Sequence, residues 1–188
     1  MNCTQISTGN YFAVVVTDKG ELYGWGSCKY CRFGINEELV EFPRKIPFTK
    51  QVRSVSAGNW HTLCVDSVGD VYGVGHNKYG ALGLGHFNEA TEFSKSQIGQ
   101  CKKVACGDGF SLYLTVEGDL YSSGHNSYHG HRSKENIHTP TKLKLDCKFE
   151  YISAGFTHSA CATTEGEVYT WGEGTFYQLG HNSKNNEK

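Results

Sequence analysis

One four-residue motif occurs four times in this chain at almost constant spacing. The motif is Gly-acidic-aliphatic-Tyr, and its glycines are 49, 49 and 48 residues apart. The copies begin at Gly20, Gly69, Gly118 and Gly166 and end at Tyr23, Tyr72, Tyr121 and Tyr169. A small-small-Gly corner lies 11 to 13 residues upstream of each copy. The corners end at Gly9, Gly58, Gly107 and Gly155. A period near 50 residues predicts an array of identical supersecondary units.

Each unit is predicted to contain short antiparallel strands. In the second unit, a β-like run over residues 52–58 ends at the corner, and the apolar run 62–65 follows it. Glycine then supplies the positive φ of a hairpin, and the chain returns over residues 71–75. A further extended stretch lies beside proline, as at 42–48. Three or four such strands per unit, without a helical period, predict an all-β blade of a β-propeller.

The repeated residues resemble the regulator-of-chromosome-condensation (RCC1) repeat family. Residues 55–65 match its aliphatic-small-small-Gly-x-x-His signature, and Trp25-Gly26 and Trp171-Gly172 match its Trp-Gly pair. The resemblance implies a β-propeller over residues 1–182 and leaves 183–188 as a polar tail. The expected repeats cover about 3–51, 52–100, 101–148 and 149–182, of which the last is truncated.

The number of repeats departs from the family pattern, because a full propeller of this family has seven blades and this chain supplies four. An open arc of four blades has an uncovered face at each end. Four alternatives follow: a fragment, a partial gene product, a half-ring that associates with itself through open blade edges, and a closed four-bladed ring.

Composition excludes several function classes. Eighteen basic and nineteen acidic side chains give a formal charge of -1, so no global field recruits nucleic acid or an anionic membrane. No apolar run approaches the roughly 18 to 20 residues that span a bilayer. We therefore expect a soluble intracellular protein, in cytoplasm or nucleus, without membrane contact or direct nucleic-acid contact.

The eight cysteines are predicted to be free thiols. Cys64 and Cys161 occupy the same small apolar position of two repeats, which is a position that free cysteine fills in a reducing compartment. Cys28 and Cys31 have the spacing of zinc ligands, yet no second pair completes a site. A loop is the preferred interpretation, and we expect no metal and no cofactor.

The recurring histidines are predicted to be structural, because catalysis needs one site and not one in each blade. His61 and His158 are expected to be buried and hydrogen-bonded. Gly58, Gly155 and the four motif tyrosines are interpreted as structural repeat residues in the same way. No nucleophile and base, carboxylate pair or phosphate loop is present, so the sequence predicts no catalytic residue.

Function in a propeller is expected where the repeats differ. The residues after each corner are predicted to line a partner-binding rim, with their aromatic side chains as anchors. They are Asn10, Tyr11, Asn59, Trp60, Asp108, Phe110, Phe156 and Thr157. The alternative is that they pack between blades. A second cluster, His125, His129, His131, Arg132 and Lys134, is interpreted as a solvated loop, with a weak metal or phosphate contact as the alternative.

These observations predict a noncatalytic protein-interaction or regulatory module. The resemblance implies a small GTPase as one class of partner. Guanine nucleotide exchange on a Ran-like GTPase is the alternative that the family's nuclear prototype suggests, although the even spacing leaves no room for an inserted exchange hairpin. A chromatin-associated adaptor is a third interpretation, and the near-neutral charge disfavours it.

Overall fold

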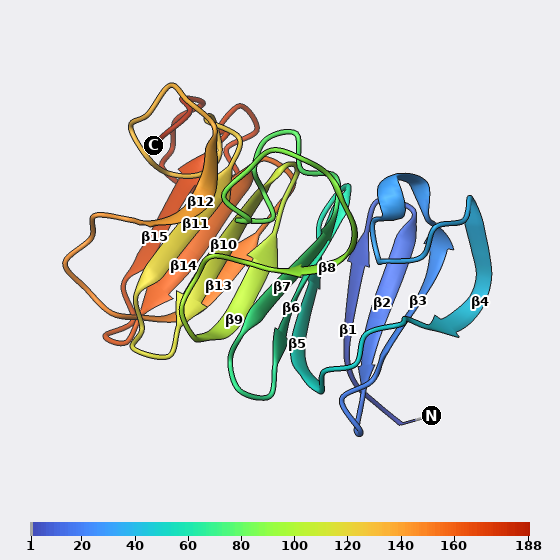
Figure 1. The fold of residues 1–188 in the computed structure, drawn as a ribbon. Coiled ribbons are helices and arrows are strands. Elements are labelled where there is room, and N and C mark those ends of the chain that lie inside the picture. Colours follow the sequence, from blue (N-terminus) through green and yellow to red (C-terminus); the bar gives the residue numbers. More distant parts are fainter. Residues whose placement is uncertain (1) are drawn as a thin grey trace.

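The computed structural model describes residues 2–188, which form four antiparallel sheets stacked in sequence order (Figure 1). Blade 1 contains β1 (Cys3–Gly9), β2 (Phe12–Thr17), β3 (Leu22–Ser27) and β4 (Leu39–Lys45), with the short helix η1 (Lys29–Cys31). Blade 2 contains β5 (Val52–Ala57), β6 (His61–Asp66), β7 (Val71–Gly75) and β8 (Ala90–Lys95). Blade 3 contains β9 (Cys101–Cys106), β10 (Phe110–Thr115), β11 (Leu120–Gly124) and β12 (Ile137–Lys142). Blade 4 contains β13 (Phe149–Ala154), β14 (His158–Thr163) and β15 (Val168–Gly172).

The predicted fold class is confirmed: the chain is a β-propeller segment of four blades. Blades 1 and 4 lie at opposite ends of the stack, and the two chain termini lie at opposite ends as well (Figure 1). The arrangement is therefore open, and the closed four-bladed ring is not formed.

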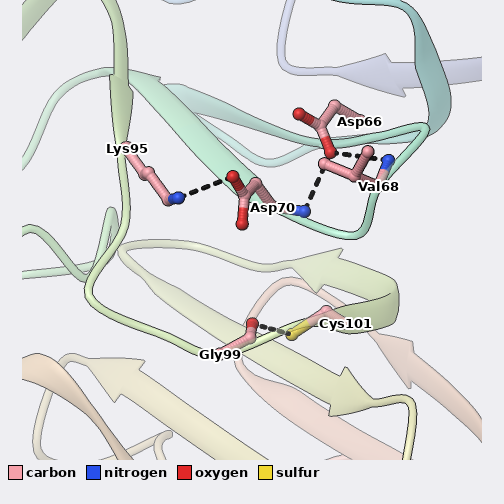
Figure 2. Close-up of polar contacts among 6 residues, drawn as sticks. All are labelled: Asp66, Val68, Asp70, Lys95, Gly99 and Cys101. Atoms are coloured by element: carbon pink, nitrogen blue, oxygen red, sulfur yellow. Dashed lines mark hydrogen bonds and ion pairs between the residues drawn. The ribbon is translucent and has the colours of Figure 1, made fainter.

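The hairpin between the second and third strands of each blade is capped by a side chain. Asp66 is buried, and its Oδ1 accepts hydrogen bonds from the backbone N–H groups of Val68 (3.1 Å) and Asp70 (2.9 Å), as Figure 2 shows. The equivalent acceptors in the other blades are Thr17, Thr115 and Thr163. The backbone of the Gly-acidic turn is thus satisfied in the same way four times.

Replacing Asp66 by alanine is expected to lower the free energy of unfolding by about 1–2 kcal/mol, because two N–H groups lose their acceptor. Asp66→Thr should restore most of the loss, since threonine performs this role in the other three blades. Urea denaturation of the three proteins measures the effect. Equal destabilisation by alanine and threonine would show that the cap is not the stabilising feature.

The acidic residue of the repeated motif pairs with a lysine on the fourth strand. Asp70 contacts Lys95 at 2.5 Å (Figure 2), Glu21 contacts Lys45 at 2.6 Å, and Asp119 contacts Lys142 at 3.0 Å. Hydrogen bonds from Lys148 and then Lys142 hold the pKa of Asp119 below its usual range. These pairs are solvent-exposed, so they contribute more to strand register than to stability. In the same view, the Cys101 thiol donates to the Gly99 carbonyl at 3.6 Å.

The apolar cores lie between consecutive blades. Alternate side chains of the second strand of each blade point toward the next blade. They pack there against side chains of that blade's first strand. Thus Val14 and Val16 pack with Val55, and Leu112 and Leu114 pack in the same way in the third core. Tyr72, Tyr121 and Tyr169 are half-buried against the three successive cores. Four blades therefore contain three cores.

The small-small-Gly corners let neighbouring blades approach closely. A Cβ built on Gly58 would lie 2.5 Å from the carbonyl oxygen of Gly107, and one built on Gly107 would lie 2.8 Å from that of Gly155. Just before the corner, Ser7 Oγ accepts the Ala57 N–H of the next blade at 2.9 Å. Glycine is therefore required where the inner strands of adjacent blades touch.

The eight cysteines are free in the described residues. Burial raises the pKa of both the Cys28 and the Cys31 thiol. Residues 2–188 contain no cluster of three His, Cys, Asp or Glu side chains placed to hold a metal ion. Over the same residues, no helix has the length and apolar character needed to cross a bilayer.

The segment 183–188, interpreted from the sequence as a polar tail, returns to the last sheet. Glu187 and Gly172 exchange two backbone hydrogen bonds of 2.9 and 3.0 Å. Gly26 pairs with Val40, and Gly75 with Ala90, at the same position of blades 1 and 2. Glu187 therefore lies at the position where the fourth strand begins in blades 1 and 2.

Candidate protein-interaction face

The loops that follow the first and third strands of each blade meet on one face of the stack, which we call the loop face. A repeated backbone hydrogen bond joins them: Ser27 N–H donates to Tyr11 O (2.8 Å), and His76 N–H donates to Trp60 O (3.0 Å). The same bond joins the two loops of blades 3 and 4. The propeller architecture therefore brings loops from all four repeats together.

Six ring side chains form a continuous row on the loop face, here called the aromatic ridge. The ridge consists of Tyr30, Trp60, His76, Tyr79, His125 and Tyr128. Neighbouring ring centroids are 4.7 to 6.1 Å apart, and most neighbours meet edge to face. The ridge crosses blades 1, 2 and 3, so it depends on their stacking.

The ridge presents apolar surface to solvent. Tyr30 is 42% exposed, and the other five rings are half-buried. Two further aromatic side chains extend from loops of the same face: Tyr11 is 78% exposed and Phe176 is 82% exposed. Exposed aromatic residues gathered on one face are typical of a protein-binding surface.

The buried side chain of Arg32 packs against Trp60 of the ridge. Its side chain is almost fully buried, and its guanidinium lies 4.6 Å from the centre of the Trp60 ring. Arg32 Nε donates to Lys29 O (2.8 Å), and one terminal nitrogen donates to Asn10 O (2.6 Å). This cation–π contact and the two hydrogen bonds hold Trp60 of blade 2 against the loops of blade 1.

The two ridge histidines are uncharged at neutral pH. Burial lowers the pKa of His76 and of His125 below the ordinary value of 6.5. Glu89, 3.8 Å from His76 Nε2, opposes this shift only in part. The ridge therefore offers flat neutral rings with hydrogen-bonding nitrogens.

Two exposed tyrosines of the loop face have a left-handed backbone. Tyr11 has φ +65° and Tyr30 has φ +63°. Blade 3 has Gly109, with φ +70°, at the position of Tyr11. A non-glycine residue in this region costs on the order of 1 kcal/mol, so two strained exposed tyrosines point to a role other than stability.

The structure places the predicted rim residues in two groups. Tyr11 and Phe156, which is 61% exposed, lie at the surface, and Asn10, Trp60 and Asp108 are partly exposed. The other three predicted rim residues are buried: Asn59, Phe110 and Thr157.

The rim assignment of these buried residues is wrong, because each one faces a neighbouring element. Phe110 is 0% exposed and belongs to the third core, since its side chain points toward blade 4. Asn59 Nδ2 donates to Asp108 Oδ1 at 2.7 Å and so joins blades 2 and 3. Thr157 Oγ1 donates to Glu173 at 2.6 Å. The alternative of packing between blades applies to Asn59 and Phe110, whereas Thr157 makes its contact within blade 4.

The recurring histidines differ in environment. His61 is fully buried, and its Nε2 lies 2.9 Å from Ser111 Oγ of the next blade. Burial lowers the pKa of His61 to about 3. His158 occupies the same position in blade 4 and is half-buried at the open end of the stack. His61 is therefore buried and hydrogen-bonded as expected, whereas the expected burial of His158 is wrong, because no further blade covers its position among residues 2–188.

The second cluster is not simply a solvated loop. His129 is fully buried, its Nε2 lies 3.2 Å from Glu135 O, and burial lowers its pKa to about 4. His131 is half-buried beside Ser122 Oγ at 3.0 Å. These rings organise the loop after β11, while Lys134 of the same loop is exposed.

One repeated aromatic position in the sequence corresponds to the ridge. Tyr30, Tyr79, Tyr128 and Phe176 each lie four residues after a glycine at the end of the third strand of their blade, which is the last residue of the strand in blades 2 to 4 and the penultimate residue in blade 1. This segment varies otherwise, so the repeated aromatic position is hidden. His76 and His125 also share a repeat position, one residue after this glycine in blades 2 and 3, whereas Arg32 has no arginine at the equivalent positions of the other blades.

Comparison with known sequences identifies the repeat. A profile of the "Regulator of chromosome condensation (RCC1) repeat" matches residues 19–65, 68–114 and 165–188, and a second profile of the repeat matches 3–27, 52–81 and 101–129. An X-linked retinitis pigmentosa GTPase regulator homolog of Caenorhabditis elegans is 51% identical over 41 residues, which cover 22% of this chain and 3% of that protein. The human E3 ubiquitin-protein ligase HERC2 is 51% identical over 37 residues, 20% of this chain and 1% of the ligase.

Solved structures show the same fold. Prp20p of Saccharomyces cerevisiae, described with its binding to Gsp1p and histones, superposes with a TM-score of 0.87 at 21% identity over 99% of this chain and 49% of its own. Human WBSCR16 superposes with a TM-score of 0.87 at 24% identity over 100% of this chain and 52% of its own. The chain thus spans about half of these structures and a few percent of the sequence relatives.

Proposed function

Because this chain belongs to the family built from RCC1 repeats, we propose that it is a noncatalytic module that binds a protein partner through the aromatic ridge, in cytoplasm or nucleus. The observation that carries the proposal is the ridge itself: six rings from three blades form one partly exposed row. Large rigid side chains of this kind dominate the energy of protein interfaces.

The environment of the ridge suits a partner that also offers apolar and hydrogen-bonding groups. The histidines are neutral, and Tyr30 is held by its backbone conformation and by contacts with the Trp60 and His76 rings. Little side-chain freedom is then lost on binding, which favours affinity. Acidic and basic residues are balanced over the chain, so the proposal does not rely on electrostatic attraction.

A small GTPase is the partner class that the relatives favour. One relative is named as a GTPase regulator homolog, and the Prp20p structure is described with its binding to Gsp1p. Guanine nucleotide exchange is the second candidate function. Exchange needs stronger binding to the nucleotide-free GTPase than to its loaded form. A chromatin-associated adaptor has support from the histone binding described for Prp20p, and the formal charge of -1 opposes it.

Replacing Tyr30 or Trp60 by alanine is expected to weaken binding to a purified Ran-like GTPase by at least about tenfold, because an anchor of an interface is removed. Calorimetric titration against the nucleotide-free and GDP-loaded forms measures the loss. Phe42→Ala is the matched control, since Phe42 is 76% exposed on β4, outside the ridge. Urea denaturation of each variant separates lost binding from lost folding.

The same proteins distinguish the candidate functions. Binding that depends on the ridge, without faster release of a fluorescent nucleotide, supports an interaction module. Faster release that is lost in the Trp60 variant supports exchange. Histone binding that is lost in the ridge variants supports the adaptor. Binding that is equal in wild type and both ridge variants would overturn the proposed surface.

A further inference from the structure

Arg32 is a buried cation without a counter-charge. Its side chain is 1% exposed, and although burial lowers its pKa, a guanidinium stays protonated at neutral pH. Within residues 2–188, no carboxylate forms an ion pair with it. Its hydrogen bonds go to neutral backbone carbonyls, those of Lys29 and Asn10. A buried charge of this kind is costly until an anion compensates it.

The repeat does not require a cation at this position. Arg32 lies six residues after Gly26, and the equivalent residues of blades 2, 3 and 4 are Ala81, Gly130 and Gln178. Blades 2 and 3 form an apolar core between them although Ala81 has no polar side chain. The arginine therefore points to a role other than the stacking of blades.

The guanidinium lies between two blades that are both present. Its Cζ atom is 4.6 Å from the centre of the Trp60 ring of blade 2 and 5.6 Å from the centre of the Phe12 ring of blade 1. Phe12 belongs to the core between these two blades. The environment of Arg32 therefore does not depend on the open ends of the stack.

One donor of the guanidinium reaches solvent. Nε and Nη1 make the two hydrogen bonds, whereas Nη2 of Arg32 has no hydrogen-bond partner within residues 2–188. The fully buried side-chain atoms without a partner in these residues belong to Asn59, His61 and Ser159, so Nη2 is not one of them. Nη2 therefore keeps a small exposed surface and can donate to a group that arrives from solvent.

A second cation and the most exposed ridge ring lie beside this donor. The carbonyls that Arg32 binds belong to the residues directly before Tyr11 and Tyr30. Lys29 is exposed, its Nζ lies 5.6 Å from the centre of the Tyr30 ring, and it forms no ion pair within residues 2–188. We call Lys29, Tyr30, Arg32 and Trp60 the cationic end of the ridge.

We propose that the cationic end of the ridge binds an aspartate or glutamate side chain of the partner polypeptide, next to an apolar residue. The carboxylate accepts a hydrogen bond from Arg32 Nη2, close to Lys29, and the apolar residue packs on Tyr30 and Trp60. A hydrogen bond between two charged groups is stronger than a neutral one, and more so where water is partly excluded. This inference rests on the function proposed above and specifies the chemistry of the partner.

Two capped peptides test the proposal without an identified partner. They are acetyl-Gly-Ser-Glu-Phe-Glu-Ser-Gly-amide and the same peptide with glutamine in place of both glutamates. Titration of the isotope-labelled full chain, followed by NMR at the Arg32 Nε–H and the Trp60 indole N–H, measures both affinities. We expect saturable shifts with the acidic peptide, and binding at least about tenfold tighter than that of the glutamine peptide.

The outcomes separate this inference from the function proposed for the ridge. Equal affinities of the two peptides would show that the ridge accepts apolar groups without recognising a carboxylate, which overturns the inference and leaves the ridge as a binding surface. Absence of saturable shifts with both peptides also overturns it, while the GTPase titration still tests the ridge. Preference for the acidic peptide supports the inference even where the GTPase does not bind.

Arg32→Gln is expected to abolish the preference for the acidic peptide, because the positive charge is lost. Glutamine suits the fold, since Gln178 occupies this position in blade 4. Urea denaturation checks the stability of the variant. An unchanged preference in folded Arg32→Gln protein would contradict the proposed site.

Lys29→Gln provides an arm that leaves the buried residue intact. It should lower the affinity for the acidic peptide about threefold, which is the effect of removing an exposed charge near a carboxylate. Lys78→Gln is the matched control, because Lys78 precedes Tyr79 as Lys29 precedes Tyr30 and no arginine follows it. Equal effects of the two lysine substitutions would mean that the carboxylate does not lie at the cationic end, contrary to the proposal.

Discussion

Gly58→Ala is expected to lower the free energy of unfolding by about 2–3 kcal/mol, because a methyl group at this corner overfills the contact between blades 2 and 3. The new Cβ would lie 2.5 Å from Gly107 O, 2.8 Å from His61 Cε1 and 3.0 Å from Cys106 Cβ. Two of these neighbours are backbone or Cβ atoms that cannot rotate away. Relief therefore requires the two blades to separate, which also weakens the core between them.

Urea denaturation measures this effect, and Gly99→Ala is its matched control. Gly99 has no heavy atom within 4 Å of a built Cβ, and its φ is negative. Alanine there should be neutral or slightly stabilising, because it restricts the unfolded chain. Equal effects of the two substitutions would show that helix or strand propensity, and not the approach of blades, determines the result.

Acidification from pH 7.5 to 5.5 is expected to destabilise the protein partly through His61. Burial lowers the pKa of His61 to about 3, against an ordinary value of 6.5 in the unfolded chain. Below pH 6.5 the unfolded state binds a proton that the folded state does not, so the free energy of unfolding falls as pH falls. At pH 5.5 this one group costs about 1.4 kcal/mol, and the loss continues until about pH 3.

His61→Phe isolates this contribution. Blades 1 and 3 have Phe12 and Phe110 at the same position, so the phenylalanine ring fits the fold, and Ser111 loses its histidine partner. We expect the variant to lose about 1.4 kcal/mol less than wild type between pH 7.5 and 5.5 in urea denaturation. Burial also lowers the pKa of His129, so some pH dependence remains in the variant. Identical slopes would contradict a neutral buried His61.

Carboxylates act in a lower pH window. Lysine neighbours lower the pKa of Glu21 and of Asp119 from ordinary values of 4.5 and 3.8. Their contribution is present above those values and is lost as pH falls further. The interval between pH 7.5 and 5.5 therefore reports on histidine alone.

The strands and turns of each blade are determined by short-range features of the sequence. A hairpin glycine such as Gly69, with φ +101°, and a cap such as Asp66 act within a few residues of their own position. Alternation along a strand shows which residues share a face, and the period shows that each blade repeats the last. These short-range effects suffice for the strands, their order and the family resemblance.

Contacts between blades were decided by the tertiary structure. Alternation of side chains does not show whether a face of a strand meets solvent or another sheet, so the sequence predicts an exposed anchor at Phe110, which blade 4 in fact covers. Tyr30, Trp60 and His125 are separated by 30 and 65 positions in sequence and meet in one ridge because the blades stack at a defined angle. The stacking of the blades depends on how the shapes and volumes of side chains fit across the interface between them. The order of residues along a single strand does not reveal this fit.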